Sequence, residues 1–181
     1  MGTARNALAV KPICALTFRA EVDAERVKSD LERLLGEVDD QSPVFAFDFT
    51  RYYLEEMGQG LQKTFFSFAR LMSPETLPEL KLKTNAVEED WADKGKRRIN
   101  VDPGYVTGGK LVLASTKDYC HRVYIGQGIY ADVQLRFIHG RFESSEWTYP
   151  DYRTDLASAF FKKARDRLVK QEREHERTHP I

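Results

Sequence analysis

Apolar and polar residues follow strand-like or helical spacing over most of the chain. Residues 11–19 form an apolar run rich in strand-forming types, which predicts a first strand. Residues 23–36 then carry Val and Leu at helical spacing, between the helix-starting residue Asp23 and the helix-ending residue Gly36. This segment predicts an amphipathic helix whose outer face is rich in acidic side chains.

The next stretch predicts shorter elements. Residues 38–43 (VDDQSP) are typical of a turn, and in residues 44–49 phenylalanines alternate with other types, as in a strand. Thr50 is a suitable cap for a short helix that ends at Gly58. Residues 64–72 predict a third strand.

A second long helix and a β-rich half complete the pattern. Residues 73–91 open with Ser-Pro and keep apolar residues three or four positions apart, which predicts a helix. Residues 99–142 change to strand patterns, with tight turns predicted at 126–128 and 139–140. A last helix is predicted to begin near Thr154.

These elements predict the fold class α+β. Strand–helix–strand units followed by a run of strands and a closing helix favour a mainly antiparallel sheet with about three to four helices packed on it. We expect a flexible N-terminus over residues 1–10, a single domain over 11–170 and a charged C-terminal tail over 171–181. A chain of 181 residues has room for one hydrophobic core of ordinary size.

Composition narrows the classes of function. Lys and Arg number 28, as do Asp and Glu, so the net charge is zero and no global field attracts nucleic acid or lipid. Short apolar runs and an N-terminus without a signal-peptide pattern predict a cytoplasmic protein with no membrane partner. Cys14 and Cys120 are expected to be reduced, because two cysteines are too few for a disulfide framework or a cysteine zinc site.

Short motifs match known signatures incompletely. Residues 175–179 read H-E-x-x-H, a zinc motif, but no apolar face surrounds them, which favours a charged tail. Residues 104–111 have the Gly and Lys spacing of a P-loop, yet Leu111 replaces the residue that ligates magnesium. Residues 126–131 imitate a dinucleotide-binding turn but lie between two predicted strands, where that motif needs a following helix. A strand connection and a hairpin turn are the simpler interpretations of the last two.

Polar side chains embedded in strand-like or aromatic segments are a more informative signal. A charged side chain that is even half-buried needs a partner, because its desolvation is costly. Such residues form either separate ion pairs and caps or one pocket with aromatic walls. The candidate catalytic residues are Asp48, Asp102, Lys117, Asp118 and His121. The candidate ligand-binding residues are Arg51, Tyr52, Arg122, Tyr124, Trp147, Tyr149, Asp151 and Arg153.

The combination of five segments carries a resemblance to a known family. They are FDFTRYY, NVDPGY, LASTKD, HRVYIGQGIYA and WTYPDY. Together they resemble a bacterial family catalogued as a domain of unknown function, some members of which carry the automatic label GTP-binding protein. The likeness runs from about Pro12 to Leu168 and implies no established activity. It includes the embedded polar residues, which favours the interpretation that they form one site.

Two functions of different classes fit these residues. In the first, a small enzyme or binding domain takes an anionic small molecule, phosphorylated or carboxylated, or a nucleotide. The anion would be held by Arg51, Lys117, His121, Arg122 and Arg153. The base or metal ligand would be Asp48, Asp102 or Asp118.

In the second, a non-catalytic module binds a protein or single-stranded nucleic acid across an aromatic face that includes the basic run 94–98. An atypical GTP-binding protein is a further alternative. The sequence identifies no cofactor, no metal site and no oligomeric state.

Overall fold

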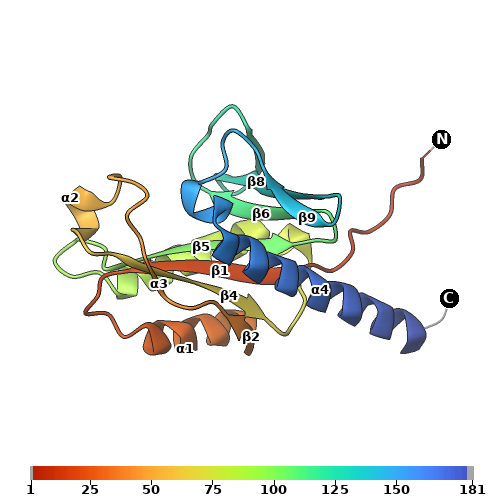
Figure 1. Cartoon of the computed structure of the whole chain (residues 1–181), viewed down its shortest axis with the longest axis horizontal. Coiled ribbons are helices and arrows are strands. Elements are labelled where there is room, and N and C mark those ends of the chain that lie inside the picture. Colours follow the sequence, from red (N-terminus) through yellow and green to blue (C-terminus); the bar gives the residue numbers. More distant parts are fainter. Residues whose placement is uncertain (1, 179–181) are drawn as a thin grey trace.

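The computed structural model describes residues 2–178 and places their strands in one sheet (Figure 1). Nine strands fall within these residues. They are β1 (Lys11–Phe18), β2 (Val38–Gln41), β3 (Phe45–Ala46), β4 (Gln62–Phe68), β5 (Ile99–Val106), β6 (Lys110–Ser115), β7 (Arg122–Gly126), β8 (Ile129–Ile138) and β9 (Arg141–Ser144).

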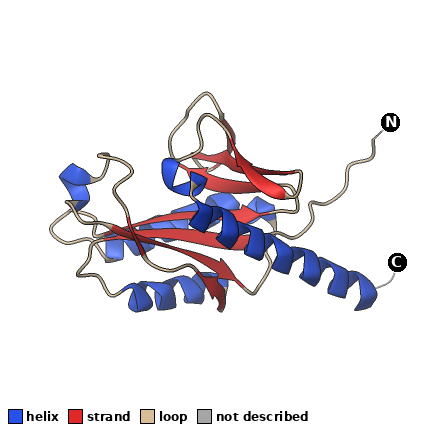
Figure 2. Cartoon of the chain, in the orientation of Figure 1, coloured by secondary structure: helices blue, strands red, loops and turns tan. Residues whose placement is uncertain are grey.

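Helices lie between the strands and after them (Figure 2). The α-helices are α1 (Ala24–Leu35), α2 (Leu54–Met57), α3 (Leu77–Asp90) and α4 (Asp155–Thr178). The short 3-10 helices are η1 (Pro74–Thr76) and η2 (Pro150–Arg153). No helix in the described part of the chain combines the length and the apolar character needed to span a membrane.

The sheet has the order β2-β4-β1-β5-β6-β8-β7, with β3 beside β4 and β9 beside β8. All of these strand pairs are antiparallel. In Figure 1 the strands β6, β8 and β9 rise above the level of β1 and β4. The predicted fold class, a single α+β domain with a mainly antiparallel sheet, is confirmed.

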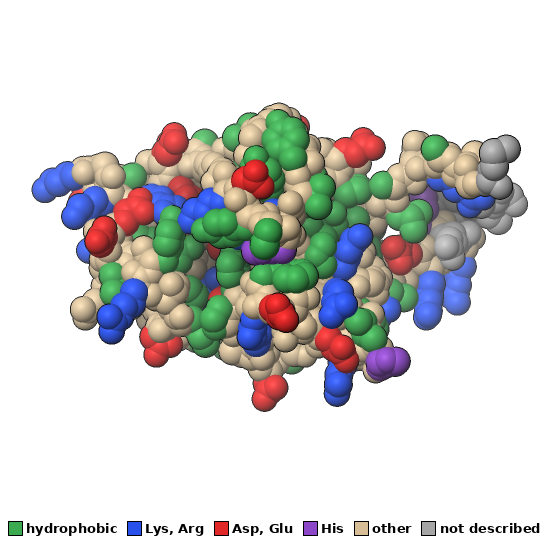
Figure 3. Space-filling view, turned by 90° about the horizontal axis from the view of Figure 1, so that it is seen from above, with side chains coloured by type: hydrophobic (Ala, Val, Ile, Leu, Met, Phe, Trp, Pro, Cys, Tyr) green, Lys and Arg blue, Asp and Glu red, His purple; other side chains and the backbone are tan. Residues whose placement is uncertain are grey.

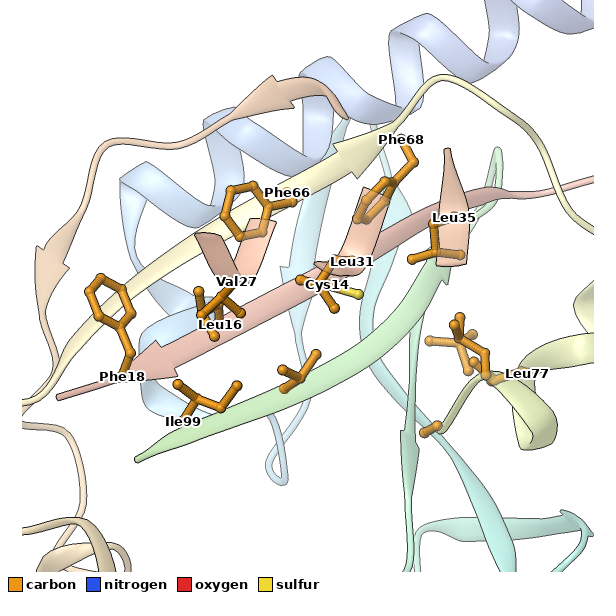
Figure 4. Close-up of a cluster of buried hydrophobic side chains, with 14 of the residues drawn as sticks. Cys14, Leu16, Phe18, Val27, Leu31, Leu35, Phe66, Phe68, Leu77 and Ile99 are labelled. Atoms are coloured by element: carbon orange, nitrogen blue, oxygen red, sulfur yellow. The ribbon is translucent and has the colours of Figure 1, made fainter. Parts of the chain in front are cut away.

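Helices cover both faces of the sheet, which explains why the whole of β1 is buried. Cys14 and Leu16 point to the face covered by α1 and α3, where they pack with side chains such as Leu31 (Figure 4). Ile13 and Ala15 point to the opposite face, which packs against α4. Alternate residues of a strand point to opposite faces, so a strand between two helical layers becomes an uninterrupted apolar run.

Most predicted elements are confirmed. Helix α1 begins after Asp23, whose Oδ1 accepts the backbone N–H groups of Glu25 (3.1 Å) and Arg26 (3.3 Å), and it ends at Gly36 with φ +87°. The turn at His139 and Gly140 has positive φ at both residues, as hairpin turns of this kind require.

Two predictions about element bounds were wrong. Residues 38–43 were predicted as a turn, but Val38–Gln41 form the edge strand β2. Its acidic side chains face cations of other elements, since Lys11 Nζ lies 2.5 Å from Asp39 Oδ2 and Arg167 Nη1 lies 3.0 Å from Asp40 Oδ2. The predicted strand 44–49 shrinks to the two residues of β3.

The last helix runs into the segment expected to be a charged tail. Helix α4 continues to Thr178, through the residues expected to form the beginning of a charged tail. Gln171 anchors this extension, because its Nε2 donates to the backbone C=O of Ala69 (2.8 Å) and its Oε1 accepts from Lys11 Nζ (3.1 Å). In Figure 1 this end of α4 projects beyond the sheet.

Candidate functional site

The candidate site is a cleft that forms where β5 and β6 part. These strands pair only over Gly104–Val106 and Leu111–Leu113. At Val101 of β5, helix α3 supplies hydrogen bonds in place of a strand. The backbone N–H of Val101 donates to Glu88 Oε1 (2.8 Å), and its C=O accepts from Lys81 Nζ (2.9 Å). Strand β5 therefore stays satisfied without β6, and the space beside it is open.

Two adjoining cavities make up the cleft, which we name by their side chains. The acidic cavity, of about 340 Å³, is lined by α3, β5, β6 and β8, and the aromatic cavity, of about 320 Å³, lies beside it. Both are lined by Tyr52, Tyr53, Asp102, Lys117 and Tyr149. The acidic cavity adds Lys81, Asn85, Glu88, Glu89, Arg97, Asn100, Leu113, Ala114, Ser115, Thr116 and Asp132. The aromatic cavity adds Phe47, Phe49, Thr50, Lys63, Tyr119, Arg122, Pro150 and Asp151.

Figure 3 shows the molecule from above, the side on which α2 and β8 lie in Figure 1. Basic and apolar side chains lie next to one another on this face. A cleft with mixed aromatic and charged walls is typical of sites that bind a small molecule with both an apolar part and a polar group.

Arg97 connects three elements at the acidic cavity. Its Nε and Nη2 donate to the two carboxylate oxygens of Glu56 in α2 (2.7 and 2.6 Å), and its Nη1 donates to Glu88 Oε2 (3.1 Å) and Asn100 Oδ1 (3.0 Å). Asn100 Nδ2 in turn donates to Asp102 Oδ2 (3.0 Å). The hydrogen bonds from Arg97 lower the pKa of Glu56. The guanidinium of Arg97 is thus already engaged by the protein.

Glu88 is buried at the back of the acidic cavity. Burial raises the pKa of Glu88, and the charge of Asp102 raises it further. Lys81, whose Nζ lies 3.8 Å from Glu88 Oε1, opposes this shift together with Arg97 and the Val101 N–H. Glu88 is therefore held by the Val101 N–H and by Arg97, and Lys81 is held by the Val101 C=O.

Arg122 and Asp132 form a second buried pair. Arg122 Nε donates to Asp132 Oδ2 (2.8 Å), its Nη1 donates to Ser115 Oγ (2.7 Å) and to the Lys117 C=O (3.0 Å), and its Nη2 donates to the Tyr149 hydroxyl (2.7 Å). Asp132 is 0 % exposed and lines the acidic cavity. Its other oxygen, Oδ1, has no hydrogen-bond partner among residues 2–178.

His121 and Trp147 lie on the outer side of this pair. Their rings stack with centroids 5.2 Å apart, and His121 Nε2 lies 3.5 Å from Asp132 Oδ2. Trp147 Nε1 donates to the backbone C=O of Val133 (2.9 Å). Neither side chain lines either cavity.

Lys63 and Asp151 form a buried ion pair under the aromatic cavity. Lys63 Nζ lies 2.7 Å from Asp151 Oδ2, and the two residues are 2 % and 3 % exposed. The ammonium also lies 4.9 Å from the ring centroid of Phe47 and 5.1 Å from that of Tyr152. These aromatic faces stabilise the cation where water is largely excluded.

Asp102 and Lys117 are the least engaged charged groups at the junction of the two cavities. Neither has an ion-pair partner within the described chain; Asp102 accepts from Asn100, and Lys117 Nζ lies 3.8 Å from the ring centroid of Tyr52. Asp102 acts on its neighbours through its charge. Burial raises the pKa of Tyr149 to about 12, and Asp102 adds to that shift while Arg122 opposes it.

The structure brings six of the predicted site residues to the walls of the cleft. They are Tyr52, Asp102, Lys117, Arg122, Tyr149 and Asp151. They come from the loop before α2, from β5, from the β6–β7 connection and the start of β7, and from η2 with the residue before it, segments that lie far apart in sequence. The fold therefore collects side chains that the sequence shows only as separate polar or aromatic residues.

The other predicted site residues do not line the cleft. Asp48, Arg51 and Asp118 are exposed outside both cavities. Tyr124 packs against Tyr130, with ring centroids 5.4 Å apart. Arg153 donates to the backbone C=O groups of Ser145, Glu146 and Thr148 and so holds the loop before η2. His121, as described above, contacts Trp147 and Asp132 outside the cavity walls.

Several lining residues were missed, although the sequence contained a signal for some of them. Lys81 and Glu88 lie on the buried face of α3, where Leu77, Leu80 and Thr84 mark the apolar stripe. Asp132 interrupts a β8 segment that otherwise reads as strand, and Lys63 precedes the apolar residues of β4. Charged residues at buried positions of regular elements were thus the useful pattern.

Two of the short motifs lie at connections between strands. Residues 104–111 span the end of β5, a turn at 107–109 and the start of β6, so they form a strand connection. Residues 126–128 are the turn between β7 and β8 and have positive φ throughout. Of the H-E-x-x-H motif, His175 lies in α4 and His179 lies outside the described residues. Within the described residues, no group of three or more His, Cys, Asp or Glu side chains has an arrangement that could hold a metal ion.

The fold and the cleft define a single α+β domain with a polar, aromatic-walled cleft at a split in an antiparallel sheet. The model of the family described as Domain of unknown function (DUF4416) matches residues 9–168. Because this match covers most of the chain, the protein belongs to that family. No curated protein and no solved structure matches the chain.

Proposed function

We propose that the cleft binds a small molecule that carries an anionic group, such as a phosphate or a carboxylate, together with a planar or apolar part. The observation that carries this proposal is the position of Lys117. Its ammonium lies over the ring of Tyr52 where the two cavities meet, and no ion pair occupies it within residues 2–178. An ammonium held beside a cavity in this way is a ready partner for an anion.

Other cationic side chains of the cleft are less available to an anion than Lys117 is. Arg97, Arg122 and Lys63 each have a carboxylate partner at 2.6–2.8 Å, so a ligand would have to displace that partner to bind them directly. Lys117 is therefore the first residue to test. Of the five residues predicted to hold an anion, it is the one that combines a lining position with a free charge.

The aromatic cavity fits the planar or apolar part of such a ligand. Phe47, Phe49, Tyr53 and Tyr149 offer ring faces or edges there. Aromatic rings stack on planar groups such as nucleobases, so nucleotides belong to the proposed class of ligand. Asp102, half-buried at the same junction, keeps the general-base role predicted for it if the ligand is a substrate.

The alternative of a flat aromatic and basic face is less well supported. Its basic part was the run 94–98, and within that run Arg97 is bonded to Glu56 and Glu88 instead of facing outward. Val123 and Tyr124 of β7 are exposed, but the run 94–98 leads into β5, which β6 and β8 separate from β7 in the sheet. Binding of a single-stranded oligonucleotide therefore serves as an alternative outcome of the test.

The experiment is titration calorimetry with adenosine 5′-monophosphate, ATP, GTP and inorganic phosphate against the wild type, Lys117→Gln and Lys110→Gln. Lys110 is an exposed lysine at the start of β6, outside both cavities, and serves as the matched control. We expect a phosphate-bearing probe to bind and Lys117→Gln to weaken it about tenfold or more, as loss of a charge-assisted contact does. Thermal stability should change by less than about 0.5 kcal/mol, as for most surface substitutions.

Other results would contradict the proposal or support one of the alternative functions. Equal binding by wild type and Lys117→Gln would contradict the proposed role of the cleft. Magnesium-dependent binding of GTP with ATP silent would support the alternative of an atypical GTP-binding protein. Binding of a single-stranded oligonucleotide without any of the small probes would support the flat-face alternative.

A further inference from the structure

Carboxylates outnumber cationic side chains in the acidic cavity. The carboxylates are those of Glu88, Glu89, Asp102 and Asp132, and the cations are those of Lys81, Arg97 and Lys117. The aromatic cavity has the reverse balance, with Lys63, Lys117 and Arg122 against Asp102 and Asp151. The ion pair of Asp132 and Arg122 joins the two cavities, and Asp102 and Lys117 line both.

Most cationic side chains of the acidic cavity already bind other groups of the protein. Lys81 Nζ donates to the Val101 C=O, and Arg97 forms two hydrogen bonds with Glu56, which does not line the cavity. These bonds hold β5 and α2 in place. They leave the carboxylate of Asp102 without a cationic partner, while Asp132 has Arg122 as its partner through Oδ2.

Asp132 provides the strongest sign that a hydrogen-bond donor is missing from the acidic cavity. It is 0 % exposed and lines the cavity; Arg122 bonds its Oδ2, while its Oδ1 has no hydrogen-bond partner in the described chain. Buried carboxylate oxygens in native proteins nearly always have a donor. The unpaired oxygen therefore points to a donor that arrives with a ligand.

Asp102 offers a second acceptor in the same cleft. One of its oxygens accepts from Asn100 Nδ2 at 3.0 Å, and no cation pairs with the carboxylate within residues 2–178. Its charge acts on both walls of the cleft, since it adds to the raised pKa of Glu88 and of Tyr149. A cationic donor placed here would pair with a carboxylate that has no other cation, in a cavity that Asp132 also lines.

We infer that the ligand of the proposed function carries a cationic N–H donor, such as an amino or amidino group, which Asp102 and Asp132 receive in the acidic cavity. Its anionic group then lies at Lys117, and its planar part lies against the tyrosines that line both cavities. The inference rests on the proposed function for the anionic group of the ligand and adds a cationic group at the other end of the ligand. The class of ligand is therefore an amine-bearing phosphate or carboxylate.

Two simpler occupants fit the same residues less well. A divalent cation needs more ligands than this region offers, because no suitable group of three His, Cys, Asp or Glu side chains exists in residues 2–178. A neutral hydroxyl would satisfy the unpaired oxygen of Asp132 but would leave Asp102 without a cationic partner.

The test compares two probes that differ in the amino group alone: O-phosphotyramine and 4-ethylphenyl phosphate. Both carry an aromatic ring and a phosphate, and only the first carries an ammonium. We expect O-phosphotyramine to bind the wild type about tenfold tighter or more, as charge-assisted hydrogen bonds allow. Asp102→Asn should remove most of that difference while it still accepts from Asn100. Asp90→Asn, an exposed change at the end of α3, should keep it.

Asp132→Asn is the second variant. Its melting temperature is measured as well, because the substitution also weakens the interaction of Arg122 with residue 132. Equal affinity for the two probes, still dependent on Lys117, would overturn the inference and leave the proposed function standing. A preference for O-phosphotyramine that persists in Asp102→Asn and in folded Asp132→Asn would also overturn it. No binding of either probe or of adenosine 5′-monophosphate would overturn the proposed function and the inference together.

Discussion

At the scale of single residues, Asp102 sets the electrostatics of the cleft. After burial, its charge is the next cause of the raised pKa of Tyr53, Tyr149 and Tyr152. These tyrosines therefore stay protonated near neutral pH by a wide margin. The Tyr149 hydroxyl accepts from Arg122 (2.7 Å), so its own proton is free to be donated to a ligand.

Gly104 allows β5 and β6 to approach closely just before they part. A Cβ added at this residue would lie 2.2 Å from the backbone oxygen of Val112 and 2.8 Å from Leu113 Cδ2. The nearest atom belongs to the backbone, which cannot turn aside as a side chain does. We expect Gly104→Ala to lower the free energy of unfolding by about 1–3 kcal/mol or more, as overpacking of a close-packed region does.

Urea denaturation of Gly104→Ala measures this effect, and Gly109→Ala is the matched control. Gly109 lies in the turn before β6, and a Cβ there would meet nothing within 4 Å. The control should therefore unfold like the wild type. Equal stability of the two variants would show that β5 and β6 move apart without cost.

The sequence pointed to Asp102, Lys117 and Tyr149 because polar or aromatic residues stood out beside apolar strands. Asp132, which binds Arg122, was not singled out, although the predicted hairpin at 126–128 places the two residues on adjacent strands. Asp48 stood out equally, yet it is exposed. Alternation within a strand identifies unusual residues but does not say which of them share a cavity.

At the scale of elements, α3 acts as a substitute strand for β5. Glu88 Oε1 accepts the Val101 N–H and Lys81 Nζ donates to the Val101 C=O, one bond for each backbone polar group of that residue. Side chains seldom take over a strand edge inside a protein, because a charged group must then be buried. The arrangement keeps β5 straight while β6 departs, and the cleft depends on it.

Replacing Glu88 tests this role. Glu88→Ala removes the acceptor of the Val101 N–H and one partner of Lys81, so we expect a loss of about 3–5 kcal/mol in the free energy of unfolding, the usual cost of breaking a buried ion pair. Glu88→Gln keeps an oxygen for the N–H and should cost less. Glu89→Ala, at the exposed neighbouring position, is the control.

Hydrogen exchange at the Val101 amide separates this role from general destabilisation. Protection should persist in Glu88→Gln and fall in Glu88→Ala under conditions where both variants are folded. Unchanged protection in Glu88→Ala would mean that another group satisfies the edge of β5.

The elements that could be predicted from the sequence are those with local signals. Helix α1 has a capping aspartate, a periodic apolar face and a terminal glycine, and all three act within the segment itself. Strand β2 has none of these, because its acidic residues make sense only beside Lys11 and the basic face of α4. The split between β5 and β6 also depends on α3, so no pattern within either strand indicated it.

At the scale of the whole molecule, the cleft lies where segments from both halves of the chain meet. The loop before α2 comes from the first half, and the β6–β7 connection and η2 come from the second. Buried tyrosines from these segments share one environment with Asp102. A change in their protonation therefore concerns the stability of the entire domain.

This environment predicts a loss of stability at alkaline pH. Burial and Asp102 raise the pKa of Tyr149 from 10 to about 12, whereas in the unfolded chain it returns to its ordinary value. Between these values the unfolded state has released a proton that the folded state still holds. The folded state binds more protons, so the free energy of unfolding falls as pH rises through this window. Tyr53 and Tyr152, whose pKa values are also raised, act in the same direction.

Urea denaturation at intervals from pH 10 to about 12 measures the slope, which should approach about 1.4 kcal/mol per pH unit for each tyrosine that titrates only after unfolding. Tyr149→Phe removes one titrating group and should make the slope shallower. Tyr124→Phe, at an exposed tyrosine outside both cavities, should leave it unchanged. A slope equal in Tyr149→Phe and wild type would mean that Tyr149 ionises freely in the folded protein, and that Asp102 does not govern the cleft.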